Sequence, residues 1–201
     1  VLDASECPPT FCTPPELVQG ILAGGHDALV ASSEGLEDEE EYGQSDLQEK
    51  LFTSKDCLVG ISAGGTTPYV VGALRYSKSI NALSIAISCV PLEQAFLPCD
   101  VDIRLITGPE IISGSTRLKA GTATKMALNI ISSSVMVKMG KVYGNRMIDL
   151  AATNKKLVDR SLRILNDLAD LDRDNGLRLL NETGGSVKIA LLMELSGLNY
   201  A

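Results

Sequence analysis

The chain has 201 residues, 45% of them hydrophobic, and a formal net charge of −7. This length suits one domain with a small appendage, and the apolar content excludes a disordered chain. Because the chain is acidic, has 4% aromatic residues and contains no stripe of lysine or arginine, we do not expect it to bind nucleic acid.

The sequence also argues against a membrane span and a metal site. The longest uncharged run, 57–74, is interrupted by the loop sequence Gly64-Gly65-Thr66-Thr67-Pro68. The five cysteines form no C-x-x-C pair and His26 is the single histidine, so the sequence lacks the ligand pattern that is typical of a zinc site. Unpaired cysteines fit a reducing compartment such as the cytoplasm, and we expect Cys57 and Cys89 to be small core residues.

The first half of the chain alternates predicted strands and helices. Short apolar runs predict strands over 17–23, 56–62, 82–90 and 101–106. Helices are predicted over 27–33, 46–52 and 67–79, and Pro68 lies near the first turn of the last of these. The acidic run 37–41 is interpreted as a solvated segment. Strands that are almost continuously apolar, separated by helices, predict an α/β fold with a parallel sheet covered by helices on both faces.

The second half is predicted to be helical. Residues 122–139 are apolar nearly all round, which is typical of a helix buried in a core or in a subunit contact. A second helix is indicated by apolar or small residues at helical spacing, namely Leu150, Thr153, Leu157, Ser161, Ile164 and Leu168. Two further short helices are expected over 175–181 and 186–195.

Ligands of an open α/β sheet bind at the carboxyl ends of its strands. Three such ends carry loop sequences, at Gly24-Gly25, at 63–67 and at 107–119. We interpret Gly24-Gly25 as a plain turn. At Gly64, Gly65, Thr66 and Thr67, two glycines and two hydroxyls lie between a strand and a helix, which is typical of a phosphate cradle. The run is neither a G-x-G-x-x-G fingerprint nor a Walker loop, so a small phosphorylated molecule is favoured over a nucleotide.

The run 108–123, which contains most of the third loop, places charged and hydroxyl side chains ahead of the long apolar helix. Glu110, Ser113, Ser115 and Lys119 are predicted to contact a ligand. Arg117 and Lys119 lie where a structural helix start favours acidic residues, so the local charge suggests a bound anion. A serine-capped helix with two solvated cations is the alternative explanation.

Six segments of the chain form specific motifs: 1–11 (VLDASECPPTF), 34–38 (EGLED), 108–129, 138–145 (KMGKVYGN), 152–157 (ATNKKL) and 185–188 (GSVK). These motifs resemble the family of N-acetylmuramic acid 6-phosphate etherases and glucokinase regulatory proteins. The resemblance covers almost the whole chain, and the first segment is closer to the etherase branch.

The resemblance implies a sugar isomerase (SIS) domain over 1–142, lacking its first strand, and a C-terminal helical region over 143–201. It also implies a homodimer, no metal or organic cofactor, and cleavage of the D-lactyl ether of N-acetylmuramic acid 6-phosphate. The products would be N-acetylglucosamine 6-phosphate and D-lactate, formed by elimination and hydration. At the family's catalytic positions this sequence has Glu6, expected to protonate the departing lactate, and Glu37, expected to handle the C2 proton.

Three departures accompany the resemblance. The family's first strand and its Gly-Ala-Gly-Thr-Ser-Gly-Arg loop are expected upstream of Val1, and further residues are expected after the last helix. In the second loop, Gly64 and Thr66 stand where the etherases usually have serine and arginine. These changes leave a non-catalytic sugar-phosphate-binding regulatory protein as the alternative function, while the etherase-like segments argue against a sugar-phosphate isomerase.

Overall fold

The structure is a computed structural model that describes residues 1–31, 34–150 and 154–199. The chain forms two compact units, one of Ile21–Leu128 and one that joins Val1–Gly20 to Asn129–Ala201. The division at residue 142 expected from the family stays a prediction. Two expectations lie partly outside the described residues. One is the end of the helix predicted over 27–33, and the other is Thr153 with the start of the segment 152–157.

The unit Ile21–Leu128 contains a three-stranded parallel sheet in the order β1-β2-β3. Its strands are β1 (Cys57–Ile61), β2 (Leu83–Ser88) and β3 (Val101–Arg104), which confirms three of the four predicted strands. The prediction of a strand over 17–23 is wrong, since no strand forms there in the described residues. Gln19 and Gly20 interrupt this run and Leu17 is 48% exposed, so the segment has no continuous apolar face to bury in a sheet.

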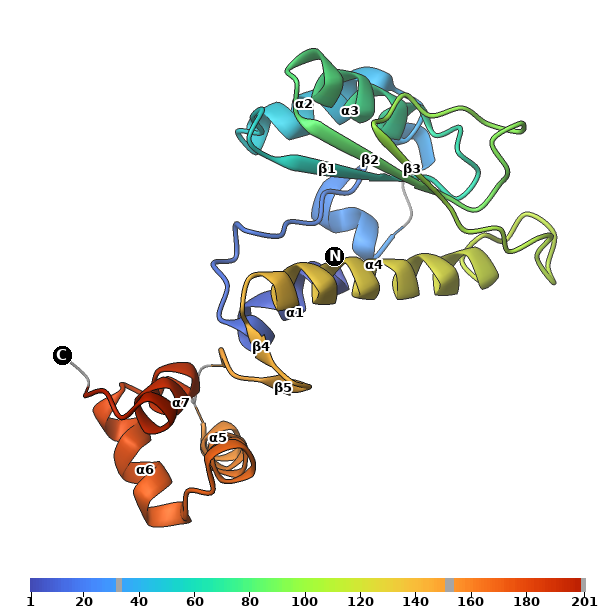
Figure 1. Ribbon diagram of the computed structural model, residues 1–201. Helices are drawn as coiled ribbons and strands as arrows, with labels where there is room; N and C mark the ends of the chain where they lie inside the picture. Colours follow the sequence, from blue (N-terminus) through green and yellow to red (C-terminus); the bar gives the residue numbers. More distant parts are fainter. Residues whose placement is uncertain (32–33, 151–153, 200–201) are drawn as a thin grey trace. The chain divides into compact units, whose positions relative to one another are not determined.

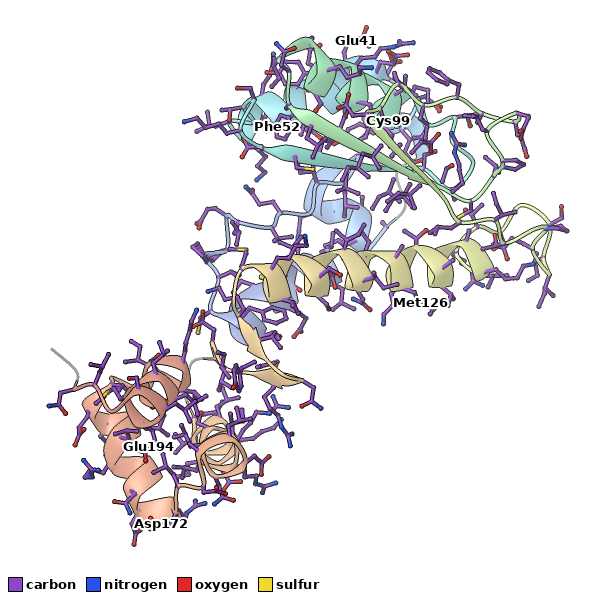
Figure 2. The ribbon with its side chains drawn as sticks, viewed as in Figure 1. Glu41, Phe52, Cys99, Met126, Asp172 and Glu194 are labelled. Carbon is purple, nitrogen blue, oxygen red and sulfur yellow. The ribbon has the colours of Figure 1, made fainter. Side chains whose placement is uncertain are left out.

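Helices α2 (Glu40–Glu49) and α3 (Pro68–Ser79) lie on one face of this sheet (Figure 1). Leu74 of α3 packs with Ala86 and Leu97 in a cluster that is at most 1% exposed. Helix α3 has the predicted bounds, whereas α2 begins six residues earlier than predicted. Glu40 and Glu41 form its first turn, where the helix dipole favours acidic side chains. Glu41 is labelled in Figure 2.

The opposite face of the sheet is also apolar but is less covered. Ile61, Leu83 and Val101 are 40%, 49% and 44% exposed. Ile87, which pairs with Ile61 on this face, is completely buried, so the face is covered in part. The expected α/β fold with a parallel sheet flanked by helices is confirmed. Cys57, at the start of β1, is exposed, so its predicted core position is wrong, while Cys89 is buried as expected.

Helix α4 (Lys119–Lys138) confirms the predicted long helix and begins three residues before the predicted start. Its apolar side chains are not all buried by this chain: Met126 (labelled in Figure 2), Ile130 and Val137 are 59%, 64% and 54% exposed. Their spacing of four and seven residues places them on one side of the helix.

The other unit contains helix α1 (Leu2–Phe11) and a small hairpin of β4 (Val142–Tyr143) and β5 (Arg146–Met147). It also holds the predicted C-terminal helices, which are α5 (Lys155–Ala169), α6 (Arg173–Glu182) and α7 (Val187–Ser196). Leu165 and Val187 are completely buried among these helices. Asn154, Asp172 and Ser186 each accept a backbone N–H at a helix start. Leu150 belongs to the same core but precedes α5.

Short 3₁₀ turns at Gly25–Leu29 and Glu34–Leu36 replace the helix expected over 27–33. None of the helices formed by the described residues is long and apolar enough to cross a membrane.

Candidate active site

The turn that follows β1 is built around Ser62 and Gly65. The backbone N–H of Gly65 donates to the Ser62 carbonyl at 3.0 Å, and the hydroxyls of Ser62 and Thr67 lie 2.9 Å apart. Gly65 has φ +73°, a conformation in which a side chain is strained, and a Cβ there would lie 2.8 Å from the Cβ of Ala95. The glycine is therefore required both by the backbone conformation and by the close approach of the next loop.

This turn presents backbone donors to solvent at the start of α3. Gly64 and Thr66 are exposed, and the described residues provide no acceptor for their N–H groups. Helix α3 has 12 residues, and its N-terminus supplies the positive end of the helix dipole. An exposed pair of N–H groups beside a helix N-terminus is a suitable site for a phosphate.

Glu37 is held at the same helix start. Its backbone carbonyl accepts the N–H of Tyr69, in the first turn of α3, at 3.0 Å. The backbone of Glu37 is thus held at the first turn of the helix that follows the Gly64–Thr67 turn, two elements that the sequence treats as separate. Glu6 is an exposed residue of α1 and belongs to the other unit.

Ser88 is a residue of this region that the sequence did not single out. It is the last residue of β2, is completely buried, and its hydroxyl has no hydrogen-bond partner among the described residues. Its Cβ lies 3.7 Å from the position that a Cβ of Gly65 would occupy. A serine at the carboxyl end of the central strand is the sequence signal that would have identified it.

The loop after β3 folds back on the start of α4. One carboxylate oxygen of Glu110 accepts the N–H of Lys119 and the other accepts the N–H of Ala120, both at 2.9 Å. These two backbone hydrogen bonds, the one from Ala120 first, lower the pKa of Glu110. The Lys119 ammonium donates to the carbonyl of Thr107 at 2.7 Å. The structure therefore brings together Glu110 and Lys119, and the anion at the start of α4 is a side chain of the loop itself.

Ser113 is exposed and Ser115 is half-buried in this loop, and the described residues provide no hydrogen-bond partner for either hydroxyl. Beside the loop, a shallow depression of about 560 Å³ is lined by Arg117, Leu118, Lys119, Thr122, Ala123 and Met126. No group of three or more His, Cys, Asp or Glu residues suited to a metal ion occurs in the described parts of the chain.

Residues 4–78 match the family model for the glucokinase regulatory protein N-terminal SIS domain, and the parallel sheet flanked by helices is consistent with a domain of this class. The chain is also 70% identical over 199 residues to an N-acetylmuramic acid 6-phosphate etherase of Prochlorococcus marinus (strain MIT 9303). Proteins of the same name from Synechococcus sp. (strain CC9605) and Gloeothece citriformis (strain PCC 7424) are 69% and 62% identical.

These alignments cover 99% of this chain, and they confirm the resemblance drawn from its motifs: the chain is a close relative of the N-acetylmuramic acid 6-phosphate etherases. The chain spans 63% to 65% of the length of these relatives.

Proposed function

We propose that the protein cleaves the D-lactyl ether of N-acetylmuramic acid 6-phosphate to N-acetylglucosamine 6-phosphate and D-lactate. The observation that carries this proposal is the near-full-chain identity of 62% to 70% to proteins with this name. The glycine-rich turn at the start of α3 supports it independently, because its exposed amides suit the 6-phosphate.

The phosphate binds, in this proposal, to the N–H groups of Gly64 and Thr66. Nothing but the Thr66 hydroxyl, 3.7 Å away, lies within 4 Å of a Cβ placed on Gly64, so the turn keeps its shape with glycine or with a small side chain there. The Ser113 and Ser115 hydroxyls are proposed to contact the sugar. Lys119 adds positive charge, and only one of the three donors of its ammonium is used by Thr107.

The chemistry divides between two carboxyl groups. Glu37 removes the C2 proton of the open-chain sugar, and the C3–O bond breaks as Glu6 protonates the lactyl oxygen. Water then adds to C3 and a proton returns to C2, which completes the hydration. One group must act as a base and the other as an acid in each half of the reaction, which is ordinary general acid–base catalysis.

We also infer that the protein is a dimer. The exposed apolar stripe of α4, formed by Met126, Ile130 and Val137, is the surface that supports this proposal. Symmetric dimers are the commonest oligomers of soluble proteins. A cytoplasmic location is proposed because all five cysteines are free, which fits a reducing compartment.

The test of the catalytic assignment is Glu6→Gln. Lactate release should fall by roughly a thousandfold, within the usual range for a general acid, while the affinity for the sugar phosphate stays the same. Glu16→Gln is the matched control, since Glu16 is also an exposed carboxylate of the same unit. Full activity of the Glu6 variant would refute the role of Glu6 as the acid.

A further inference from the structure

The loop between Thr107 and Lys119 is closed at its neck by two sets of contacts. The carboxylate of Glu110 accepts the N–H groups of Lys119 and Ala120, and the ammonium of Lys119 donates to Thr107. Both ends of the loop are therefore tied to the first residues of α4. We call these contacts the neck of the loop.

The tip of this loop makes few apolar contacts. Ile111 and Ile112, at its tip, are 90% and 61% exposed, so burial of apolar surface does not hold them. Gly108 and Gly114 have φ +65° and +81°, and no atom lies within 4 Å of a Cβ placed on either. Backbone hydrogen bonds shape the second half of the loop, such as the one from the Ser115 N–H to the Ile112 carbonyl at 3.0 Å. Because the tip packs against so little, these bonds and the neck together determine where the hydroxyls of Ser113 and Ser115 lie.

The neck also neutralises the start of α4. A 20-residue helix presents unpaired N–H groups and a partial positive charge at its N-terminus. In this protein two of those N–H groups already donate to a carboxylate. At the start of α3, by contrast, the carbonyl of Glu37 takes one N–H and the exposed amides of Gly64 and Thr66 are open.

We propose that Glu110 is a positioning residue: its carboxylate occupies the anion position of α4, excludes the substrate phosphate from that helix start, and holds Ser113 and Ser115 in place for the sugar. The substrate phosphate is thereby directed to the start of α3. The choice of sugar phosphate as the ligand rests on the proposed function, whereas the neck stands on the contacts of Glu110 alone.

The first experiment measures amide hydrogen exchange in the full chain. In Glu110→Gln, the amide nitrogen of the new side chain cannot accept an N–H, so one charge-assisted hydrogen bond is lost. Exchange at Lys119 and Ala120 should accelerate at least about tenfold. The control is Glu93→Gln, which changes an exposed acid after β2 that has no hydrogen bond or ion pair to the described residues, and it should leave both amides unchanged. Unchanged exchange in the Glu110 variant would overturn the proposal.

The second experiment titrates the wild-type chain with inorganic phosphate and follows the amide resonances. We expect shifts at Gly64 and Thr66 and none at Lys119 or Ala120; shifts at Lys119 and Ala120 would overturn the exclusion of phosphate from α4. If none of the four amides shifts, the phosphate site proposed at α3 fails, while the exchange result still decides the role of Glu110.

A kinetic readout separates positioning from folding. Glu110→Gln should lower kcat/KM for the sugar phosphate by about tenfold or more and leave unchanged the affinity for inorganic phosphate at the start of α3, measured from the shifts of Gly64 and Thr66, because phosphate bound there does not touch Glu110. Glu110→Asp keeps the charge but is one methylene shorter, so it should recover part of the loss. Equal weakening of phosphate and sugar-phosphate binding in the Gln variant would show that Glu110 contacts the phosphate.

Discussion

Replacing Gly65 by alanine should destabilise the sheet unit far more than the same change at its neighbour Gly64. Two separate costs fall on Gly65. Its φ of +73° places a new side chain in the left-handed region, at a cost of about 1–2 kcal/mol. Its Cβ would also lie 2.8 Å from that of Ala95, and overpacking a close contact typically costs about 1–3 kcal/mol. We expect a total loss of roughly 2–5 kcal/mol.

Two other glycines of the site separate these costs. Gly108 has φ +65°, but no atom lies within 4 Å of a Cβ placed on it. Gly108→Ala should therefore lower the free energy of unfolding only by the conformational cost, about 1–2 kcal/mol. Gly64 is not among the residues with positive φ, and its Cβ would touch only the Thr66 hydroxyl, at 3.7 Å. Gly64→Ala should therefore change the free energy of unfolding by less than about 0.5 kcal/mol.

The assay is amide hydrogen exchange in β2, which reports the free energy of opening of the sheet unit without interference from the other unit. From most to least stable, the predicted order of the variants is Gly64→Ala, Gly108→Ala, Gly65→Ala. The Gly65 variant should also bind phosphate more weakly, because the strained turn no longer holds its amides in place. If Gly65→Ala is as stable as Gly64→Ala, the reasoning about this turn is wrong.

Three further predictions concern the core and one carboxylate. Tyr69→Phe removes a hydrogen bond to Asp46 and should lower the free energy of unfolding by about 1 kcal/mol. Burial and the Asp46 carboxylate raise the pKa of Tyr69. In an alkaline absorbance titration Tyr69 should therefore ionise at a higher pH than the exposed tyrosines. Leu165→Ala, at a completely buried site, should destabilise the C-terminal helices by about 2–5 kcal/mol in calorimetry and leave exchange in β2 unchanged. Hydrogen bonds from Ser84 lower the pKa of Asp100, so protection of the Ser84 amide should be constant above about pH 4 and be lost as the pH falls through the lowered pKa.

The parts of the fold that follow from local signals were predictable from the sequence. Thr67-Pro68 marks the start of α3, and the bounds of that helix agree with the structure. The apolar run at 17–23 was misassigned because a short run does not show whether a sheet edge is available to it. The exposure of Met126 on α4 was also not predictable. An apolar helix face indicates that the face is buried, but not whether this chain or another molecule buries it.

In the candidate site, contacts between residues that are apart in the sequence were likewise not predictable. The cations beside the start of α4 were interpreted as marking a bound anion, and sequence pattern alone did not reveal that the carboxylate of Glu110, nine residues before Lys119, accepts the N–H groups there. The link between Glu37 and α3 is a backbone hydrogen bond to Tyr69, which leaves no side-chain signal. The sequence did not single out Ser88, because a serine at a strand end is common and its burial is seen only in the structure.

The most direct test of the proposed function is lactate release from N-acetylmuramic acid 6-phosphate by the purified protein in D₂O. The proposal predicts equal amounts of D-lactate and N-acetylglucosamine 6-phosphate, with deuterium at C2 of the sugar, and a loss of roughly a thousandfold in both Glu6→Gln and Glu37→Gln. A wild-type protein that binds the sugar phosphate but releases no lactate, or a product that keeps its original C2 proton, would contradict it.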